Sequence, residues 1–196
     1  MRQVRVFARA RLPSRHGEFE IVSFIDEAGR TLDDVAIVRG DVAGADDVPT
    51  RVHSECLTGD VFGSFRCDCR DQLELALDRF RKLERGIILY LRQEGRGIGI
   101  AQKVRAYELQ QDGLDTVEAN HHLGFDDDLR DYSAAAAMLR ALGVGSVELH
   151  TNNTRKIEGL RAGGVEVHSR AAIIAPAREE NRGYLATKRD KSGHLL

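Results

Sequence analysis

Apolar and polar residues alternate in short runs over the first 55 positions of the chain. Turn residues such as Gly17, Gly29 and Gly44 separate four of these runs, QVRVFARA, FEIVSFI, DVAIVRG and TRVHSE. Alternation with a period of two places apolar side chains on one face of a strand, and breaks at glycine favour hairpins. The pattern therefore predicts a largely antiparallel sheet in the N-terminal part of the chain.

The apolar spacing becomes helical after position 70. The residues that share this spacing are Leu73, Ala76, Leu77, Phe80 and Leu83. A helix there would begin near Cys67 and Cys69, where backbone amides at its N-terminus would stabilise thiolates.

Strands and helices are expected to alternate in the second half. The run GIILYL predicts a buried strand, and a helical pattern runs through Val104, Tyr107 and Leu109. After Asp131 come a helix in YSAAAAMLRALG, a strand in SVELH, a short helix from Arg155 and a strand in VEVHS. These patterns predict a mixed α+β fold. Without an evident repeat or linker, residues 1–196 are expected to form one domain, with 176–196 a loosely held C-terminal tail.

Composition narrows the class of protein. The chain has 196 residues, of which 42% are hydrophobic and 31% charged, and its formal net charge is −2 at pH 7. These values are typical of a globular protein, and they lack the basic excess that a nucleic-acid backbone requires. The N-terminus has no apolar run of the signal-peptide type, and no segment reaches 18 apolar residues. We therefore expect a cytoplasmic protein with no nucleic-acid or membrane partner.

All three cysteines lie close together in the sequence, at Cys56, Cys67 and Cys69. Three cysteines cannot all pair, and a reducing cytosol disfavours disulfides. Three thiolates can instead hold zinc and leave the fourth tetrahedral position to water, as in a catalytic site. Two alternatives stay open: His53 could be a fourth ligand of a structural zinc site, or the cysteines could be separate buried residues.

The glycine-rich segment EGRGIG directly follows the predicted strand GIILYL. Its glycines are Gly95, Gly97 and Gly99, but Ile100 stands where a dinucleotide-binding motif needs glycine or alanine. A strand-to-helix turn with exposed amides and Arg96 could still bind phosphate, and an ordinary flexible turn is the alternative.

Two more polar segments have both a functional and a structural interpretation. In GFDDDLRDY, Asp128 and Arg130 face the same way only if the segment is extended, and a solvated loop is the alternative. In TNNTRK, Thr151 and Asn153 could cap a helix that binds phosphate with Lys156 in its first turn, and plain helix capping is the alternative.

Several motifs in order resemble the GTP cyclohydrolase II family over nearly the whole chain. They are RVHSECLTGD, RCDC, RQEGRGIG, AYELQ, DTVEAN, LGFDDDLRDY, TNN and the ending GHLL. The resemblance implies that GTP and water yield formate, pyrophosphate and 2,5-diamino-6-ribosylamino-4(3H)-pyrimidinone 5′-phosphate, the entry step of riboflavin biosynthesis. It also implies one zinc ion per subunit, magnesium with the triphosphate, and a homodimer. The family also occurs fused to a second synthase domain, which we do not expect in these 196 residues.

The same resemblance assigns roles to individual residues. The implied zinc ligands are Cys56, Cys67 and Cys69. The residues that match the family's catalytic positions are Tyr107, Asp128 and Arg130. The residues that match its GTP-holding positions are Arg51, Val52, His53, Ser54, Glu55, Gln72, Glu94, Gly95, Arg96, Thr116, Thr151 and Lys156. Arg70 and Thr154 depart from the family's usual glycine and proline.

In the family, the arginine matching Arg130 is assigned as a nucleophile toward the α-phosphorus. Removing a proton from guanidinium at neutral pH costs about 7 kcal/mol or more, so we expect Arg130 to stabilise transition-state charge instead. Three other functions remain alternatives: a paralogue that yields the formylated pyrimidine or feeds another pathway, a GTP sensor with structural zinc, and a redox switch.

Overall fold

The computed structural model describes residues 1–195. Leu196, the last residue of the predicted tail and of the GHLL motif, lies outside the described residues. The chain divides into two units, each made of three segments. Unit 1 consists of Met1–His53, Glu74–Arg92 and Asp131–Ile173. Unit 2 consists of Ser54–Leu73, Gln93–Arg130 and the chain from Ile174 onward.

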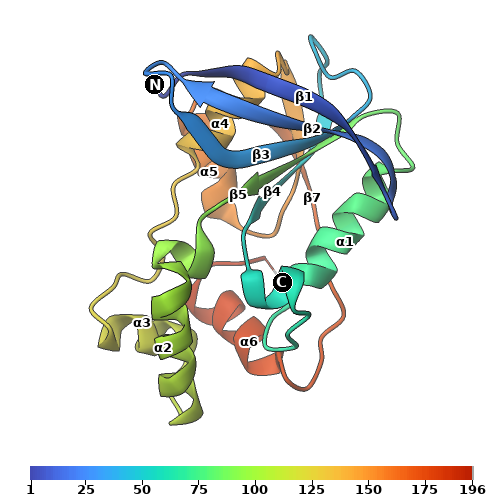
Figure 1. Ribbon diagram of the computed structural model, residues 1–196. Helices are drawn as coiled ribbons and strands as arrows, with labels where there is room; N and C mark the ends of the chain where they lie inside the picture. The colour runs from blue at the N-terminus through green and yellow to red at the C-terminus, as the bar shows by residue number, and fades with distance from the viewer. Residues whose placement is uncertain (196) are drawn as a thin grey trace. The chain divides into compact units, whose positions relative to one another are not determined.

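A seven-stranded mixed sheet forms most of unit 1 (Figure 1). Its strands in chain order are β1 (Val4–Ser14), β2 (Gly17–Asp26), β3 (Thr31–Arg39), β4 (Val48–Ser54), β5 (Gly86–Leu91), β6 (Ser146–His150) and β7 (Glu166–Ala171). Their order across the sheet is β1-β2-β3-β5-β4-β6-β7. The pairs β1–β2, β2–β3 and β3–β5 are antiparallel, whereas β4–β6 and β6–β7 are parallel.

The predicted fold class is confirmed. The expectation of antiparallel pairing holds for β1, β2 and β3, but it is wrong for β4, which pairs in parallel with β6. Residues Val48 to Thr50 form this pairing with Val147 to Leu149, nearly 100 positions later. Alternation of apolar residues shows that a strand has a buried face, but it does not select the neighbouring strand.

Two helices of unit 1, α4 (Ser133–Ala141) and α5 (Thr154–Ala162), share a core with the sheet. Phe24 and Leu89 of the strands, Met138 of α4 and Leu160 of α5 are all fully buried in this cluster. Helix α5 connects the parallel strands β6 and β7, which need a crossover of this kind. Both helices were predicted from the sequence, the second with its start at Arg155, one residue later than in the structure.

Unit 2 is mostly helical. It contains a π-helical turn (Leu57–Val61), a 3₁₀ turn (Glu94–Gly97), α2 (Gly99–Gln111), α3 (Thr116–His122) and α6 (Arg182–Lys191). Helix α1 (Cys69–Phe80) begins in unit 2 and continues into unit 1. Helix α3 packs against both α2 and α6, and α2 and α3 lie side by side in Figure 1. No helix in the described part of the chain combines the length and the apolar character needed to cross a bilayer.

Sequence reasoning missed α3 and α6. Asp115 accepts hydrogen bonds from the backbone N–H groups of Val117 and Glu118, while the Glu118 side chain accepts from the Asp115 backbone. This capping box starts α3, and the D-x-x-E pattern in DTVE could have revealed it. Helix α6 lies inside the segment expected to be a loosely held tail.

Candidate metal centre and catalytic residues

Cys56, Cys67 and Cys69 come together in unit 2. Their Sγ atoms all lie within 4.8 Å of one another, and those of Cys56 and Cys67 are 3.6 Å apart. Two sulfur atoms that each bind a tetrahedral zinc ion at about 2.3 Å lie about 3.8 Å from one another. Within residues 1–195 this is the one group of three or more potential metal ligands, and it contains no histidine. The spacing thus predicted a real cluster, and its geometry is consistent with a zinc site.

Gly59 allows the three cysteines to converge. It lies in the π-helical turn that follows Cys56, and its N–H donates to Cys56 Sγ at 3.4 Å. A Cβ atom at this position would lie 2.9 Å from Cys67 Sγ and 3.1 Å from Cys56 Sγ. Only glycine leaves this space to the sulfur atoms. We did not single out Gly59 in the sequence, although its place in CLTGD, three residues after a ligand, was a usable signal.

The charges of the cluster also favour a bound cation. Hydrogen bonds from Cys67 and Cys69, together with the charge of Lys103, lower the pKa of Cys56. The hydrogen bonds with Cys56 raise the pKa values of Cys67 and Cys69, and burial adds to the increase. Three thiolates so close together repel one another, and a divalent cation among them would remove that penalty. The residues therefore fit a zinc ion in both geometry and donor type.

Lys103 on α2 contacts the cluster directly. Its Nζ donates to Cys56 Sγ at 3.2 Å and to Glu94 Oε1 at 2.7 Å. The other oxygen of Glu94 accepts from the backbone N–H of Leu57 at 2.6 Å. Burial alone would lower the pKa of Lys103, but the charges of Cys56 and Glu94 outweigh burial and raise it. Sequence reasoning identified Glu94 through the resemblance and missed Lys103.

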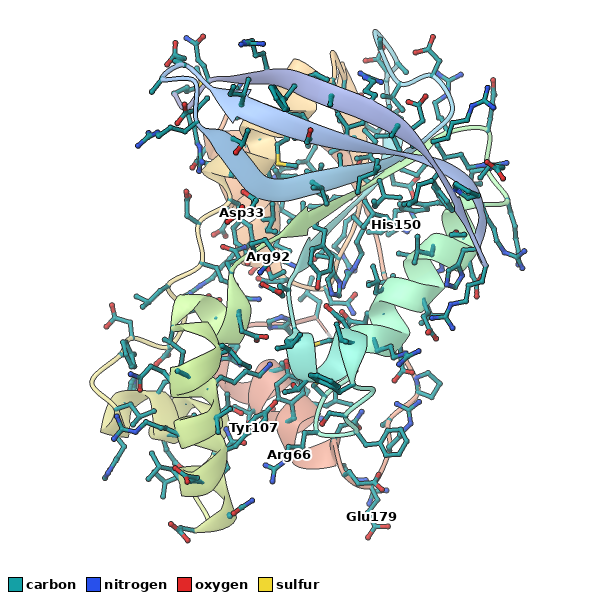
Figure 2. All side chains as sticks on the ribbon, in the orientation of Figure 1. Asp33, Arg66, Arg92, Tyr107, His150 and Glu179 are labelled. Carbon is teal, nitrogen blue, oxygen red and sulfur yellow. The ribbon has the colours of Figure 1, made fainter. Side chains whose placement is uncertain are left out.

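Tyr107 lies one helical turn beyond Lys103 on α2. Its hydroxyl shares a hydrogen bond of 3.0 Å with the hydroxyl of Thr58, two residues after Cys56. The guanidinium carbon of Arg66 lies 4.8 Å from the centroid of the Tyr107 ring, and both residues are labelled in Figure 2. Burial raises the pKa of Tyr107, so the phenol is protonated at neutral pH.

The EGRGIG segment forms the strand-to-helix turn that its sequence predicted. Gly95 and Arg96 both have left-handed backbone conformations, with φ of 61° and 58°. The carbonyl of Arg96 accepts from the N–H of Leu129 at 3.0 Å, which ties this turn to the segment that carries Asp128 and Arg130. A non-glycine residue in this conformation is strained, and such strain is often found at functional sites.

Asp128 and Arg130 form a two-fold hydrogen-bonded ion pair. Nε and Nη2 of Arg130 donate to the two carboxylate oxygens of Asp128, each at 2.7 Å. Both side chains are largely buried. The segment is neither helix nor strand, and within it the two side chains pair with one another.

The residues that match the family's GTP-holding positions are divided between the two units. Those in unit 1 are Arg51, Val52, His53, Thr151 and Lys156. Those in unit 2 are Ser54, Glu55, Gln72, Glu94, Gly95, Arg96 and Thr116.

In unit 1, three of these side chains have contacts within the unit. Arg51 Nη1 donates to the carbonyl of His150 at 3.0 Å, and Lys156 Nζ donates to the carbonyl of Val52 at 2.6 Å. The ring of His53 stacks on Tyr90 with centroids 5.4 Å apart. All of these side chains except that of Tyr90 are buried.

The segment TNNT caps α5. The side chain of Asn153 accepts from the N–H of Arg155 at 2.9 Å, and Thr151 Oγ1 accepts from the N–H of Asn153 at 3.0 Å. The capping interpretation of this segment is therefore confirmed, with Asn153 rather than Thr151 as the N-cap. Lys156 lies in the first turn of the helix, as expected.

In unit 2, the remaining positions lie at the end of β4, on turns and near helix starts. Ser54 Oγ accepts from Gln93 Nε2 at 3.0 Å. Gln72 Nε2 donates to Asp68 Oδ2 at 2.5 Å, and Asp68 lies between two of the cysteines. Thr116 is the first residue of α3.

Unit 2 thus contains a three-cysteine cluster that fits a metal ion, a buried lysine beside it, a protonated tyrosine and an aspartate–arginine pair. These features are typical of an enzyme domain. A model described as GTP cyclohydrolase II matches residues 4–172, and the chain belongs to this family.

Three relatives are each called riboflavin biosynthesis protein RibBA. The protein of Bacillus cereus (strain ATCC 14579) is 51% identical over 189 residues, which cover 96% of this chain and 47% of the relative. That of Bacillus mycoides (strain KBAB4) is 51% identical over 185 residues, 94% of this chain and 46% of the relative. That of Bacillus cytotoxicus is 50% identical over 185 residues, which also cover 94% of this chain and 46% of the relative. The chain spans about half the length of the curated relatives it matches.

Among solved structures, a similar one is the crystal structure of RibBX, a two-domain 3,4-dihydroxy-2-butanone 4-phosphate synthase from A. baumannii. It has a TM-score of 0.47 and 16% sequence identity, and the match covers 89% of this chain and 41% of that chain. This likeness is too weak to support any conclusion about the site.

Proposed function

We propose that this domain hydrolyses GTP to formate, pyrophosphate and 2,5-diamino-6-ribosylamino-4(3H)-pyrimidinone 5′-phosphate, the entry step of riboflavin biosynthesis. The observation that carries the proposal is the convergence of Cys56, Cys67 and Cys69 around Gly59 in a member of the GTP cyclohydrolase II family. The names of the relatives, riboflavin biosynthesis proteins, support the pathway.

Cys56, Cys67 and Cys69 would hold one zinc ion per subunit. Bound there, zinc would act as a Lewis acid that activates water for attack on C8 of the guanine ring. Three thiolate ligands leave one tetrahedral position for a fourth group, as catalytic zinc sites require.

Arg130 would stabilise the charge that develops on the phosphates as pyrophosphate leaves. Its guanidinium already donates two hydrogen bonds to Asp128, and this ion pair favours the charged, protonated form. Asp128 would hold the planar guanidinium of Arg130 in a fixed orientation, so that this group need not reorient as charge develops on the phosphates. The pair thus supports charge stabilisation rather than nucleophilic attack by Arg130.

Tyr107 would donate a proton to the substrate during ring opening. Its raised pKa keeps the phenol protonated at neutral pH, and its hydrogen bond with Thr58 fixes the direction of the hydroxyl. A positioned acid of this kind contributes about 10²–10⁴-fold to a rate.

GTP would be bound by the residues that match the family's GTP-holding positions. Among them, Arg51, Arg96 and Lys156 would supply positive charge for the triphosphate, together with Mg²⁺. We further propose a homodimer in the cytoplasm, on the basis of the family resemblance.

The test incubates the purified protein with zinc, magnesium and GTP, measures formate and pyrophosphate together, and identifies the pyrimidine by mass. Equal amounts of the two products support the proposal, and Cys67→Ser should abolish formate. Pyrophosphate without formate would indicate a paralogue that leaves the formyl group in place. GTP binding with neither product would indicate a sensor.

A further inference from the structure

We propose that Lys103 is a positioning residue. It bonds to both the Cys56 thiolate and the Glu94 carboxylate, and so it fixes the position of the metal centre relative to the nucleotide-binding turn that carries Glu94. The inference rests on the proposed function in that it takes the cysteine cluster as a metal centre.

The contacts form a closed ring within unit 2. Lys103 Nζ donates to Cys56 Sγ and to Glu94 Oε1, at 3.2 Å and 2.7 Å. Glu94 Oε2 accepts from the N–H of Leu57, the residue after Cys56, at 2.6 Å. One side of the ring is covalent, and the other three are hydrogen bonds. A displacement of the lysine would therefore disturb both a metal ligand and Glu94.

The surrounding backbone is shaped around this lysine. Its side chain is 13% exposed and that of Glu94 is 9% exposed, so water does not screen the pair effectively. Gly95 has a φ of 61°, and a Cβ there would lie 3.2 Å from the Cβ of Lys103. The turn that carries Glu94 can approach the lysine stem this closely because residue 95 is glycine.

The chemistry of the ammonium group suits this role. It presents three N–H donors at one compact point, so a single atom can serve a sulfur and a carboxylate oxygen together. Its charge also compensates the excess negative charge that three thiolates leave on a divalent cation. Donors to metal ligands orient those ligands and adjust their basicity, and losing such a donor typically weakens metal binding about 10–100-fold.

The experiment compares metal binding in the full chain, the Lys103→Met variant and an Arg105→Met control. Arg105 lies on the same helix, is exposed, and contacts Gln102 of its own helix. Zinc affinity is measured by competition with a chelator. The cobalt(II)–thiolate charge-transfer band is measured as a second readout, because a hydrogen bond to sulfur moves that band to higher energy.

We expect Lys103→Met to weaken zinc binding about 10–100-fold and to move the cobalt band to lower energy, with Arg105→Met unchanged. Because Lys103→Met leaves the buried Glu94 carboxylate without a counter-charge and could unfold the chain, Glu94→Gln is also compared with the Glu94→Gln/Lys103→Met double variant. The cobalt band should lie at higher energy in Glu94→Gln than in the double variant, since only Glu94→Gln keeps the Lys103 ammonium that donates to Cys56 Sγ.

Equal zinc affinity and an equal cobalt band in Glu94→Gln and the double variant would overturn the role of Lys103. A wild-type protein that shows the thiolate band but produces no formate from GTP would overturn the proposed function and leave this inference standing. A wild-type protein with no thiolate band would overturn both.

Discussion

Asp128 accepts two hydrogen bonds from the side chain of Arg130, from Nε and Nη2, each 2.7 Å long. Burial alone would raise the pKa of Asp128, but the hydrogen bonds and charge of Arg130 outweigh it and hold the pKa below the ordinary 3.8. A carboxylate with a lowered folded pKa stabilises the fold above its unfolded pKa of about 3.9, and that stabilisation is lost as the pH falls through the folded value.

The first prediction concerns this pH dependence. Asp128→Asn should lower the free energy of unfolding by about 1–3 kcal/mol at pH 7, because hydrogen bonds to a charged partner are lost. The difference from the wild type should shrink below about pH 4 and vanish once Asp128 is protonated in the folded protein. Urea unfolding of both proteins between pH 7 and pH 3 measures this difference in the free energy of unfolding. A difference that stays constant down to pH 3 would contradict the assignment.

The second prediction separates charge from geometry at Arg130. Arg130→Lys keeps the positive charge but loses the planar fork that donates twice to Asp128. We expect kcat to fall about 10²–10³-fold, the usual cost of removing a preorganised donor at a developing charge. Arg130→Ala should lose pyrophosphate release altogether. Rapid-quench measurement of pyrophosphate checks both variants, and trapping of a phosphoramidate on Arg130 would establish covalent catalysis instead.

The third prediction concerns the space between the cysteines. Gly59→Ala would place a Cβ 2.9 Å from Cys67 Sγ and 3.1 Å from Cys56 Sγ, so the ligands must move apart. We expect loss of stoichiometric zinc and of formate production, measured by metal analysis and by product assay. Gly183→Ala is the matched control, because a Cβ there meets nothing within 4 Å and the residue lies in α6. Equal zinc content in the two variants would contradict the prediction.

The fourth prediction concerns the phenol of Tyr107. Tyr107→Phe should keep full zinc binding and lower the rate of formate release about 10²–10⁴-fold, because the proton donor is lost while the ring remains. Thr58→Val removes the hydrogen bond that lowers the pKa of Tyr107, so any alkaline limb due to this phenol should move to higher pH. Formate release measured against pH checks both variants. An unchanged rate in Tyr107→Phe would remove Tyr107 from the catalytic residues.

Much of the fold could be predicted because its signals are local. The run GIILYL coincides with β5, SVELH coincides with β6, and the alanine-rich segment contains α4. The cysteines could be grouped because they are close in sequence. In each case the information lies within about fifteen residues.

The parts that could not be predicted depend on packing between distant segments. Pairing of β4 with β6 joins residues nearly 100 positions apart, and neither strand pattern specifies its partner. Lys103 lies 47 positions from Cys56. On a helix, a lysine is usually solvent-exposed. Its role emerges only when α2 packs against the turn after Cys56, because that contact buries the ammonium beside Glu94.

The last prediction concerns how α6 is tied to the cysteine loop. Lys188 of α6 donates to Asp68 Oδ1 at 2.7 Å, and both side chains are buried. Lys188→Met would leave the carboxylate of Asp68 without its counter-charge, and breaking a buried pair in this way costs about 3–5 kcal/mol. Lys191→Met is the control: Lys191 is on the same helix and is more exposed, and it pairs at the surface with Asp115 and Glu118. Urea unfolding of the zinc-loaded proteins measures the difference.

Deleting the chain after Arg182 extends this argument from stability to function. The deletion removes Lys188 and most of α6, so Asp68, which lies between two metal ligands and accepts from Gln72, loses its ammonium partner. Because Gln72 matches a GTP-holding position, we expect a higher KM for GTP as well as lower stability, whereas Lys191→Met should change neither. If KM and kcat of the truncated protein equal those of the full chain, α6 has no part in nucleotide binding, and its contact with Asp68 serves folding alone.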